Sequence, residues 1–176
     1  MKKTVVVYKS VSGFTKKYAE WISEELHADL FDLRQVDSKI LSGFDIFIYG
    51  GSLHASGVNG YSIFKKKLKN LYDKQLIVFA VGASPKKDDL IKEITEDNFT
   101  SEELSRIKFY YLRGGFDFNK LNFTNKILMT LFKWKILLKK NRTPDEKGML
   151  SAYSKPQDFT KREYINEILD YVKLIF

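Results

Sequence analysis

Short apolar runs alternate with helical spacings along most of the chain. The run TVVVYK, residues 4–9, is β-branched and continuous, which is typical of a strand buried on both faces. Four more strand-like runs follow, at residues 28–33, 44–50, 75–82 and 107–115. Helical spacings of apolar residues occur at 14–27, 61–71 and 160–175, with short helices expected within 84–106. This alternation predicts an α/β fold with helices on both faces of a parallel sheet.

The five strands predict a doubly wound sheet with the order 2-1-3-4-5, and a ligand crevice at the carboxyl ends of strands 1 and 3. Glycine or hydroxyl residues end strands 1, 3, 4 and 5, where such a crevice requires open backbone. The chain has no internal repeat and no linker-like segment, so we expect a single domain over residues 1–176.

The segment between the first strand and the first helix, SVSGFT at residues 10–15, has the composition of an anion site. Backbone N–H groups at a helix start lack intrahelical partners, and hydroxyls and a glycine surround the same point. Lys16 and Lys17 occupy the first helical turn, where carboxylates are normally favoured. A bound phosphate would account for both features, although the spacing matches neither a P-loop nor a dinucleotide fingerprint. The alternative is that Ser12 or Thr15 caps the helix and the lysines are solvated.

Composition limits the other chemistry of the chain. The absence of cysteine excludes disulfides and zinc–thiolate sites, and with two separated histidines we expect no metal site. Lys and Arg number 30 against 22 Asp and Glu, for a formal net charge of +8, which leaves nucleic acid, an anionic membrane and an acidic ligand open as partners. No signal-like segment or long apolar run occurs, so we expect a cytoplasmic protein.

Residues 125–142, NKILMTLFKWKILLKKNR, form the most unusual stretch. Drawn as a helix, they align an apolar stripe on one side, comprising Ile127, Leu131, Trp134 and Leu138. Lys126, Lys133 and Lys140 recur on another side, and Leu128, Phe132, Ile136 and Leu137 extend beyond the stripe. The pattern suits peripheral binding to an anionic membrane, on the inner face of the cell membrane. It equally suits packing on the chain's own domain or on a second copy in a homodimer. The scattered lysines and the lack of a recognition motif give no expectation of nucleic-acid binding.

Three segments together resemble a known family. V-V-Y-x-S-x-S-G-x-T at residues 6–15 is similar to the phosphate-binding signature of flavodoxins, and IYGGSLHASGVNGYSIFKKKL at 48–68 is similar to their glycine-rich loop after strand 3. Residues 110–159 resemble the insertion of the protoporphyrinogen dehydrogenases of the flavodoxin superfamily, which are menaquinone-linked FMN enzymes. The resemblance implies a flavodoxin-like fold with an amphipathic helical insertion at about residues 116–150.

The resemblance also implies a set of FMN-binding residues. The phosphate would lie against Ser10, Ser12, Gly13, Phe14 and Thr15. The isoalloxazine ring would lie along Ser52, Leu53, His54 and Ala55, with its other edge near Gly82, Ala83 and Ser84. These two ring loops contain no aromatic residue, unlike those of small flavodoxins, so the ring is either more open or covered by Phe116 or Phe118.

The implied function is an FMN-dependent oxidoreductase that takes electrons from a porphyrinogen-like substrate and passes them to a quinone near the insertion. No catalytic side chain is assigned. His54 is either catalytic or bonded to backbone, and Arg113 and Arg142 either pair with substrate carboxylates or make surface contacts. The alternatives are a flavodoxin-type electron carrier that docks a protein through residues 116–142, and a binding module of the same fold without flavin.

Overall fold

The computed structural model describes residues 2–68, 74–121 and 123–175. Its main sheet holds five parallel strands in the order β2-β1-β3-β5-β6, which confirms the predicted order and the α/β fold. The strands are β1 (Thr4–Lys9), β2 (Asp29–Asp32), β3 (Ile46–His54), β5 (Gln75–Gly82) and β6 (Ile107–Arg113). A short sixth strand, β4 (Gly57–Val58), pairs antiparallel with the end of β3.

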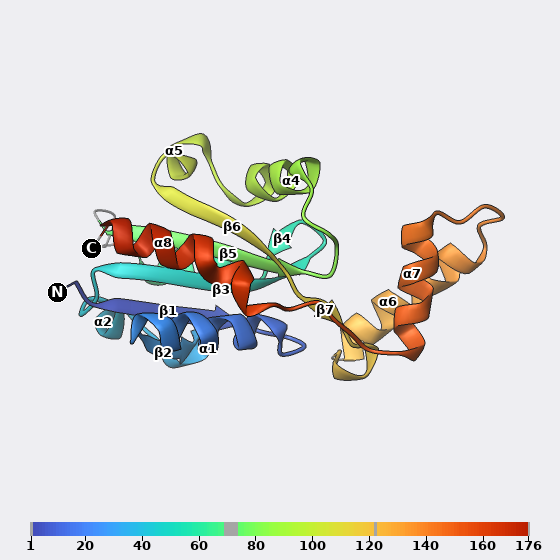
Figure 1. The fold of residues 1–176 in the computed structure, drawn as a ribbon, viewed down its shortest axis with the longest axis horizontal. Helices are drawn as coiled ribbons and strands as arrows, with labels where there is room; N and C mark the ends of the chain where they lie inside the picture. Colours follow the sequence, from blue (N-terminus) through green and yellow to red (C-terminus); the bar gives the residue numbers. More distant parts are fainter. Residues whose placement is uncertain (1, 69–73, 122, 176) are drawn as a thin grey trace.

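Helices cover both faces of this sheet, because its central strands are apolar on both sides (Figure 1). One face packs against α1 (Phe14–Leu26) and α8 (Asn166–Ile175), the latter preceded by the 3₁₀ turn η3 (Arg162–Ile165). The other face packs against η1 (Leu33–Gln35), α2 (Ser38–Leu41), α3 (Tyr61–Lys67) and α4 (Asp88–Asn98), and the short helix α5 (Ser101–Leu104) precedes β6.

Alternate residues of β1 belong to different cores, which explains its continuous apolar run. Val6 packs with Tyr18 and Ile22 of α1, whereas Val5 and Val7 pack in the core beneath α3. All three valines are fully buried. Complete burial of each such side chain contributes about 1.5–3 kcal/mol to folding.

The third strand is longer than predicted. The sequence predicts a strand over residues 44–50 that stops at Gly50-Gly51. In the structure, β3 continues to His54, and the chain then turns back as β4. A Cβ atom on Gly50 would lie 2.2 Å from the ring of Phe79. This glycine therefore allows the Phe79 ring to lie close to the backbone of β3. The expectation was wrong because the glycine pair was interpreted as a strand end.

The third helix agrees only partly with its predicted apolar face. Phe64 and Leu68 are buried, but Ile63 is exposed, so the predicted face including Ile63 was wrong. The expected helix 61–71 ends at Lys67 in α3, and Leu71 lies outside the described residues.

The insertion forms an arm beyond the carboxyl end of the sheet (Figure 1). Its base is an antiparallel ladder, and its elements are β7 (Gly115–Phe116), η2 (Phe118–Lys120), α6 (Phe123–Leu137), α7 (Pro144–Ser154) and β8 (Gln157–Asp158). Tyr153 of α7 donates a hydrogen bond to the carbonyl of Met129 in α6 at 2.6 Å, and Ile136 is buried.

The apolar stripe of α6 faces away from the protein. Trp134 is 65% exposed and Leu138 is 83% exposed, and Ile127 and Leu131 are also exposed. The stripe therefore does not pack on the chain's own domain, although Ile136 of the same helix is buried. Among the described residues, no helix combines the length and apolar character needed to cross a membrane.

Candidate functional site

Three loops at the carboxyl ends of β1, β3 and β5 converge on one cavity of about 200 Å³. It is lined by nine of the predicted residues: Ser12, Phe14, Thr15, Ser52, Leu53, His54, Ala55, Gly82 and Ala83. An adjoining cavity of about 660 Å³ shares Val11, His54 and Leu121 with the first and is lined by Ser10. The crevice lies where the strand order predicts it.

The N-terminus of α1 has no side-chain cap. Its N-cap residue is Gly13, with a φ of 95°, a conformation that favours glycine. The alternative that Ser12 or Thr15 caps the helix is therefore wrong. Ser10 Oγ instead accepts the Gly13 N–H at 3.1 Å, which holds the loop closed, while Ser12 and the buried Thr15 line the cavity. This loop combines an uncapped helix start with two hydroxyl-bearing residues, as an anion site requires.

The two first-turn lysines each have a carboxylate partner within the chain. Lys17 Nζ lies 2.9 Å from Asp158 Oδ2, and Lys16 Nζ lies 3.6 Å from Glu20 Oε1. Asp158 belongs to the returning strand of the insertion, 141 residues away in sequence. The positive charge at this helix start therefore helps to fix the base of the arm.

Basic side chains nevertheless surround the adjoining cavity. Lys9, Arg34, Lys67 and Lys120 line it together with a single carboxylate, Asp32. Arg34 Nε lies 2.8 Å from Asp32 Oδ1 and holds the pKa of that carboxyl below its usual value, chiefly through this hydrogen bond. Lys67 Nζ donates to the Val36 carbonyl at 2.6 Å, a contact that leaves its positive charge in place. The lining thus carries more positive than negative charge and favours an anionic ligand.

The hairpin between β3 and β4 is held by α4. The Asn98 side chain accepts the Val58 N–H at 2.8 Å and donates to the Ser56 carbonyl at 2.7 Å. His54 is exposed on the rim between the two cavities. Ala55 has a φ of 53°, an uncommon conformation for a residue with a side chain. The hydrogen bonds with Asn98 of α4 thus hold the conformation of this turn.

The loop after β5 is held by β6. Tyr111 donates to the Ser84 carbonyl at 2.6 Å, and burial raises its pKa to about 12, so it remains a donor at neutral pH. Arg113 Nε lies 3.3 Å from the Ala83 carbonyl oxygen, and its guanidinium lies 3.9 Å from the Phe159 ring. Arg142 likewise donates to the Ile136 carbonyl at 3.0 Å at the end of α6. Both arginines therefore make contacts within the chain.

The insertion completes the first cavity with residues that the sequence did not predict. They are Asp117, Leu121, Asn125, Leu128 and Met129, and they lie beside Phe116, which the sequence did name. Asp117 is 8% exposed, and its Oδ1 atom accepts the Asn119 N–H at 3.0 Å. Phe116 packs against Tyr153 with ring centroids 5.2 Å apart, so of the two phenylalanines considered it is the one that reaches the cavity. The arm is therefore a wall of the site, a relation that no local motif signals.

The doubly wound sheet and the crevice at the carboxyl ends of its central strands define the class of doubly wound α/β proteins with a crevice at the strand switch point. A family model described as a flavodoxin domain matches residues 5–143. The chain therefore belongs to the flavodoxin domain family.

Individual relatives are distant. An uncharacterized protein of Methanocaldococcus jannaschii is 26% identical over 114 residues, which are 64% of this chain and 75% of the relative. Oxidised flavodoxin 2 of Bacillus cereus has a TM-score of 0.41 and 20% identity, covering 63% of this chain and 85% of its own. Two-electron reduced flavodoxin of Megasphaera elsdenii has a TM-score of 0.44 and 18% identity, with coverages of 61% and 82%.

Proposed function

We propose that this chain binds FMN at the crevice and acts as an FMN-dependent oxidoreductase. The observation that carries the proposal is the uncapped start of α1, where Ser12 and Thr15 line a cavity at the switch point of the sheet. Backbone N–H groups at such a helix start suit a phosphate, and the basic lining of the adjoining cavity suits its charge. The residues present therefore fit the phosphate end of the cofactor.

The remaining predicted residues fit the flavin ring. Ser52, Ala55, Gly82 and Ala83 bring small side chains and open backbone to the same cavity. Leu53, His54 and, from the insertion, the aromatic ring of Phe116 complete this part of its lining. Bound flavin would supply the hydride and electron transfer, and the protein would position and tune it. Ser10 and Gly13 act by shaping the phosphate loop, and Ser84 by anchoring the loop after β5.

The wall contributed by the insertion favours an enzyme over a simple electron carrier. Leu121, Asn125, Leu128 and Met129 narrow the approach to the ring loops, as a substrate pocket requires. In this proposal a porphyrinogen-like substrate gives up electrons in the cavity, and a quinone receives them beside the arm. A carrier that docks a protein through residues 116–142 is the alternative, and the exposed apolar stripe of α6 supports such docking as well.

The arm also supports a proposal of peripheral membrane binding. Trp134 and Leu131 are exposed on α6, and Lys126, Lys133 and Lys140 lie on the same segment. An apolar face flanked by lysines suits the headgroup region of an anionic bilayer, where a quinone resides.

FMN titration of Ser12→Asp tests the cofactor proposal. A carboxylate beside the phosphate position should weaken FMN binding at least about tenfold, because two like charges would meet in the loop. The same carboxylate should leave the apo-protein as stable or slightly more stable, since it suits the helix start. The matched control is Ser62→Asp in the first turn of α3, which also begins at a left-handed glycine without a side-chain cap. Unchanged FMN affinity in Ser12→Asp would contradict the proposal.

Turnover separates the enzyme from the carrier. Anaerobic reduction of a quinone analogue by protoporphyrinogen should proceed with the wild-type protein and fall at least about tenfold in Leu128→Glu, which places a charge on the cavity wall. Leu174→Glu, on the exposed side of α8, is the matched control. Reduction of the bound flavin by dithionite with no turnover of either substrate would favour the carrier.

A further inference from the structure

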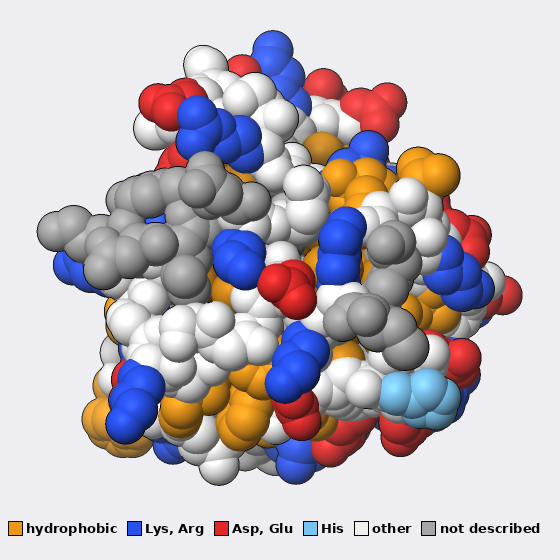
Figure 2. Space-filling model, turned by 90° about the vertical axis from the view of Figure 1, so that its left-hand side faces the viewer, with side chains coloured by type: hydrophobic (Ala, Val, Ile, Leu, Met, Phe, Trp, Pro, Cys, Tyr) orange, Lys and Arg blue, Asp and Glu red, His pale blue; other side chains and the backbone are white. Residues whose placement is uncertain are grey.

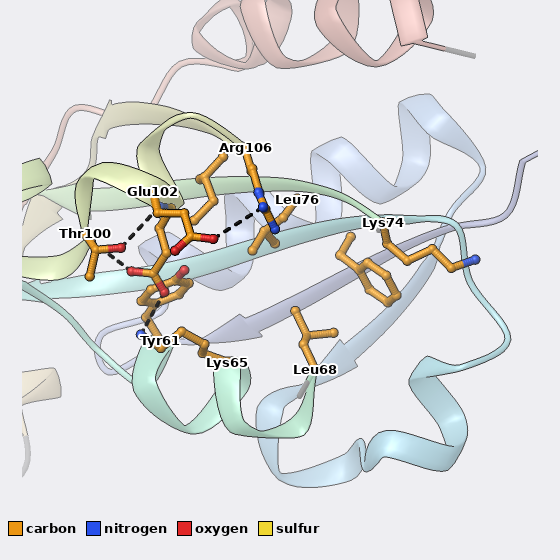
Figure 3. Close-up of a pocket in the computed structure, with 11 residues that line it drawn as sticks. Tyr61, Lys65, Leu68, Lys74, Leu76, Thr100, Glu102 and Arg106 are labelled. Atoms are coloured by element: carbon orange, nitrogen blue, oxygen red, sulfur yellow. Dashed lines mark hydrogen bonds and ion pairs between the residues drawn. The ribbon is translucent and has the colours of Figure 1, made fainter. Parts of the chain in front are cut away.

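A further cavity, of about 250 Å³, lies near the amino ends of the strands, whereas the crevice lies at their carboxyl ends. Figure 3 shows the residues that line it. Its floor is a row of three side chains at the amino ends of neighbouring strands: Phe47, Leu76 and Ile107. The strand register places Phe47 beside Leu76 and Leu76 beside Ile107, so the three lie on one face. Leu68 of α3 and the ring of Tyr61 add further apolar wall.

The hydroxyl of Tyr61 is the unusual group in this cavity. The side chain is 3% exposed, and among the described residues its hydroxyl oxygen is buried without a hydrogen-bond partner. Its ring is fixed edge-on to Phe99, with centroids 4.9 Å apart. Buried hydroxyls in native proteins are normally bonded, so the Tyr61 hydroxyl, in a side chain that lines the cavity, is a donor still available to an acceptor.

The polar rim of the cavity is already neutralised. Lys65 Nζ lies 2.8 Å from Glu103 Oε1, and Arg106 Nη2 lies 3.3 Å from Glu102 Oε1, as the dashed lines in Figure 3 indicate. Lys74, also on the rim, lies 2.9 Å from an Asp45 oxygen. Figure 2, which views the end of the molecule where both chain termini lie, shows basic and acidic side chains interspersed. The rim therefore offers no surplus charge to an ionic ligand.

We propose that this cavity binds a small, uncharged and largely apolar molecule with one hydrogen-bond acceptor for the Tyr61 hydroxyl. An apolar cavity of about 150 Å³ holds benzene, so 250 Å³ accommodates a benzene-sized ring with a short substituent. Aromatic ketones and esters have this chemistry. A water molecule is a poorer occupant, because it needs two to four polar partners and the floor is apolar. The site is separate from the crevice and does not depend on flavin binding.

Acetophenone is a direct probe, since it joins a phenyl ring to one carbonyl acceptor. We expect saturable binding to the wild-type protein by ligand-observed NMR, about five- to tenfold tighter than ethylbenzene, which lacks the acceptor. Benzoate, which carries a charge, should not bind. In Tyr61→Phe the preference for acetophenone over ethylbenzene should fall to within about twofold. Tyr110→Phe is the matched control, because its hydroxyl donates to the Glu167 carbonyl outside this cavity, and it should keep the preference.

A cavity-filling variant localises the binding. Leu76→Trp should abolish acetophenone binding while FMN titration of the same variant remains as in the wild type. Circular dichroism verifies its folding, and if it does not fold, Tyr61→Phe decides alone. No saturable binding to the wild type, a preference that survives Tyr61→Phe, or unchanged binding to a folded Leu76→Trp would each overturn the proposal.

Discussion

Ala55 at the tip of the β3–β4 hairpin is held in a left-handed conformation that costs a residue with a Cβ atom about 1–2 kcal/mol. The strain persists because Asn98 fixes the backbone that follows Ala55, at Ser56 and Val58. Ala55→Gly should therefore raise the free energy of unfolding by about 1 kcal/mol, measured by urea denaturation of the apo-protein. Ala83→Gly in the loop after β5 is the control and should be neutral or destabilising. A less stable Ala55→Gly would contradict the assigned strain.

The unpartnered Tyr61 hydroxyl leads to a second prediction about a single side chain. A buried polar group without a partner costs about 1–3 kcal/mol, so Tyr61→Phe should leave the ligand-free protein equally or more stable. Tyr49→Phe is the matched comparison, since that buried hydroxyl donates to the Asn59 carbonyl at 2.7 Å and its loss should destabilise. Thermal melts of both variants measure the difference, and a destabilised Tyr61→Phe would indicate a hydrogen bond to the hydroxyl.

Individual elements differ in how well the sequence predicts them. β1 was predicted at its observed bounds, since an apolar run buried on both faces is a local signal. The end of β3 was not, because Gly50 makes room for a Phe79 ring that only the folded sheet brings close. Likewise the cavity residues of the three loops follow from local motifs, whereas Asp117 and Met129 reach the same cavity by a long-range return of the chain.

The link between α1 and β8 depends on pH. Burial raises the pKa of the Asp158 carboxyl, but hydrogen bonds from Thr160 and Lys17 outweigh burial and hold this pKa below its ordinary value of 3.8. A lowered folded-state pKa adds stability that is complete above the unfolded value and is lost as the pH falls through the folded value. Asp158→Asn should therefore lower the free energy of unfolding at pH 7, by less than about 1 kcal/mol since the pair is exposed.

The difference in the free energy of unfolding between Asp158→Asn and the wild type should shrink as the pH falls from about 5 toward 2. Urea denaturation across that pH range measures this difference. Asp170→Asn is the control, because its pair with Lys173 spans 3.8 Å between highly exposed side chains. A difference that persists at the lowest pH would assign the effect to something other than the charge of Asp158.

At the scale of the whole molecule, the arm separates two kinds of surface. Its base and inner side line the crevice, and its outer side presents the apolar stripe of α6. The double variant Leu131→Glu with Trp134→Glu should lose co-sedimentation with anionic vesicles and retain FMN binding. Raising the salt concentration should weaken wild-type binding, because lysine attraction is screened. Leu174→Glu on α8 is the control, and equal vesicle binding by all three proteins would contradict a membrane role for α6.

Sedimentation equilibrium of the same proteins tests whether a second copy of the chain covers the apolar stripe of α6. A wild-type dimer that the double variant in α6 dissociates would mean that a second copy covers these side chains. A monomer that binds vesicles would assign them to the lipid surface.

In the proposed function, the open start of α1 binds the phosphate of FMN. Riboflavin carries the same ring without the phosphate, so titration of the apo-protein with the two flavins isolates this contribution. We predict that FMN binds at least about 100-fold more tightly than riboflavin, as expected for several charge-assisted hydrogen bonds to one dianion. Equal affinity for the two flavins, or no binding of either, would contradict phosphate binding at the start of α1.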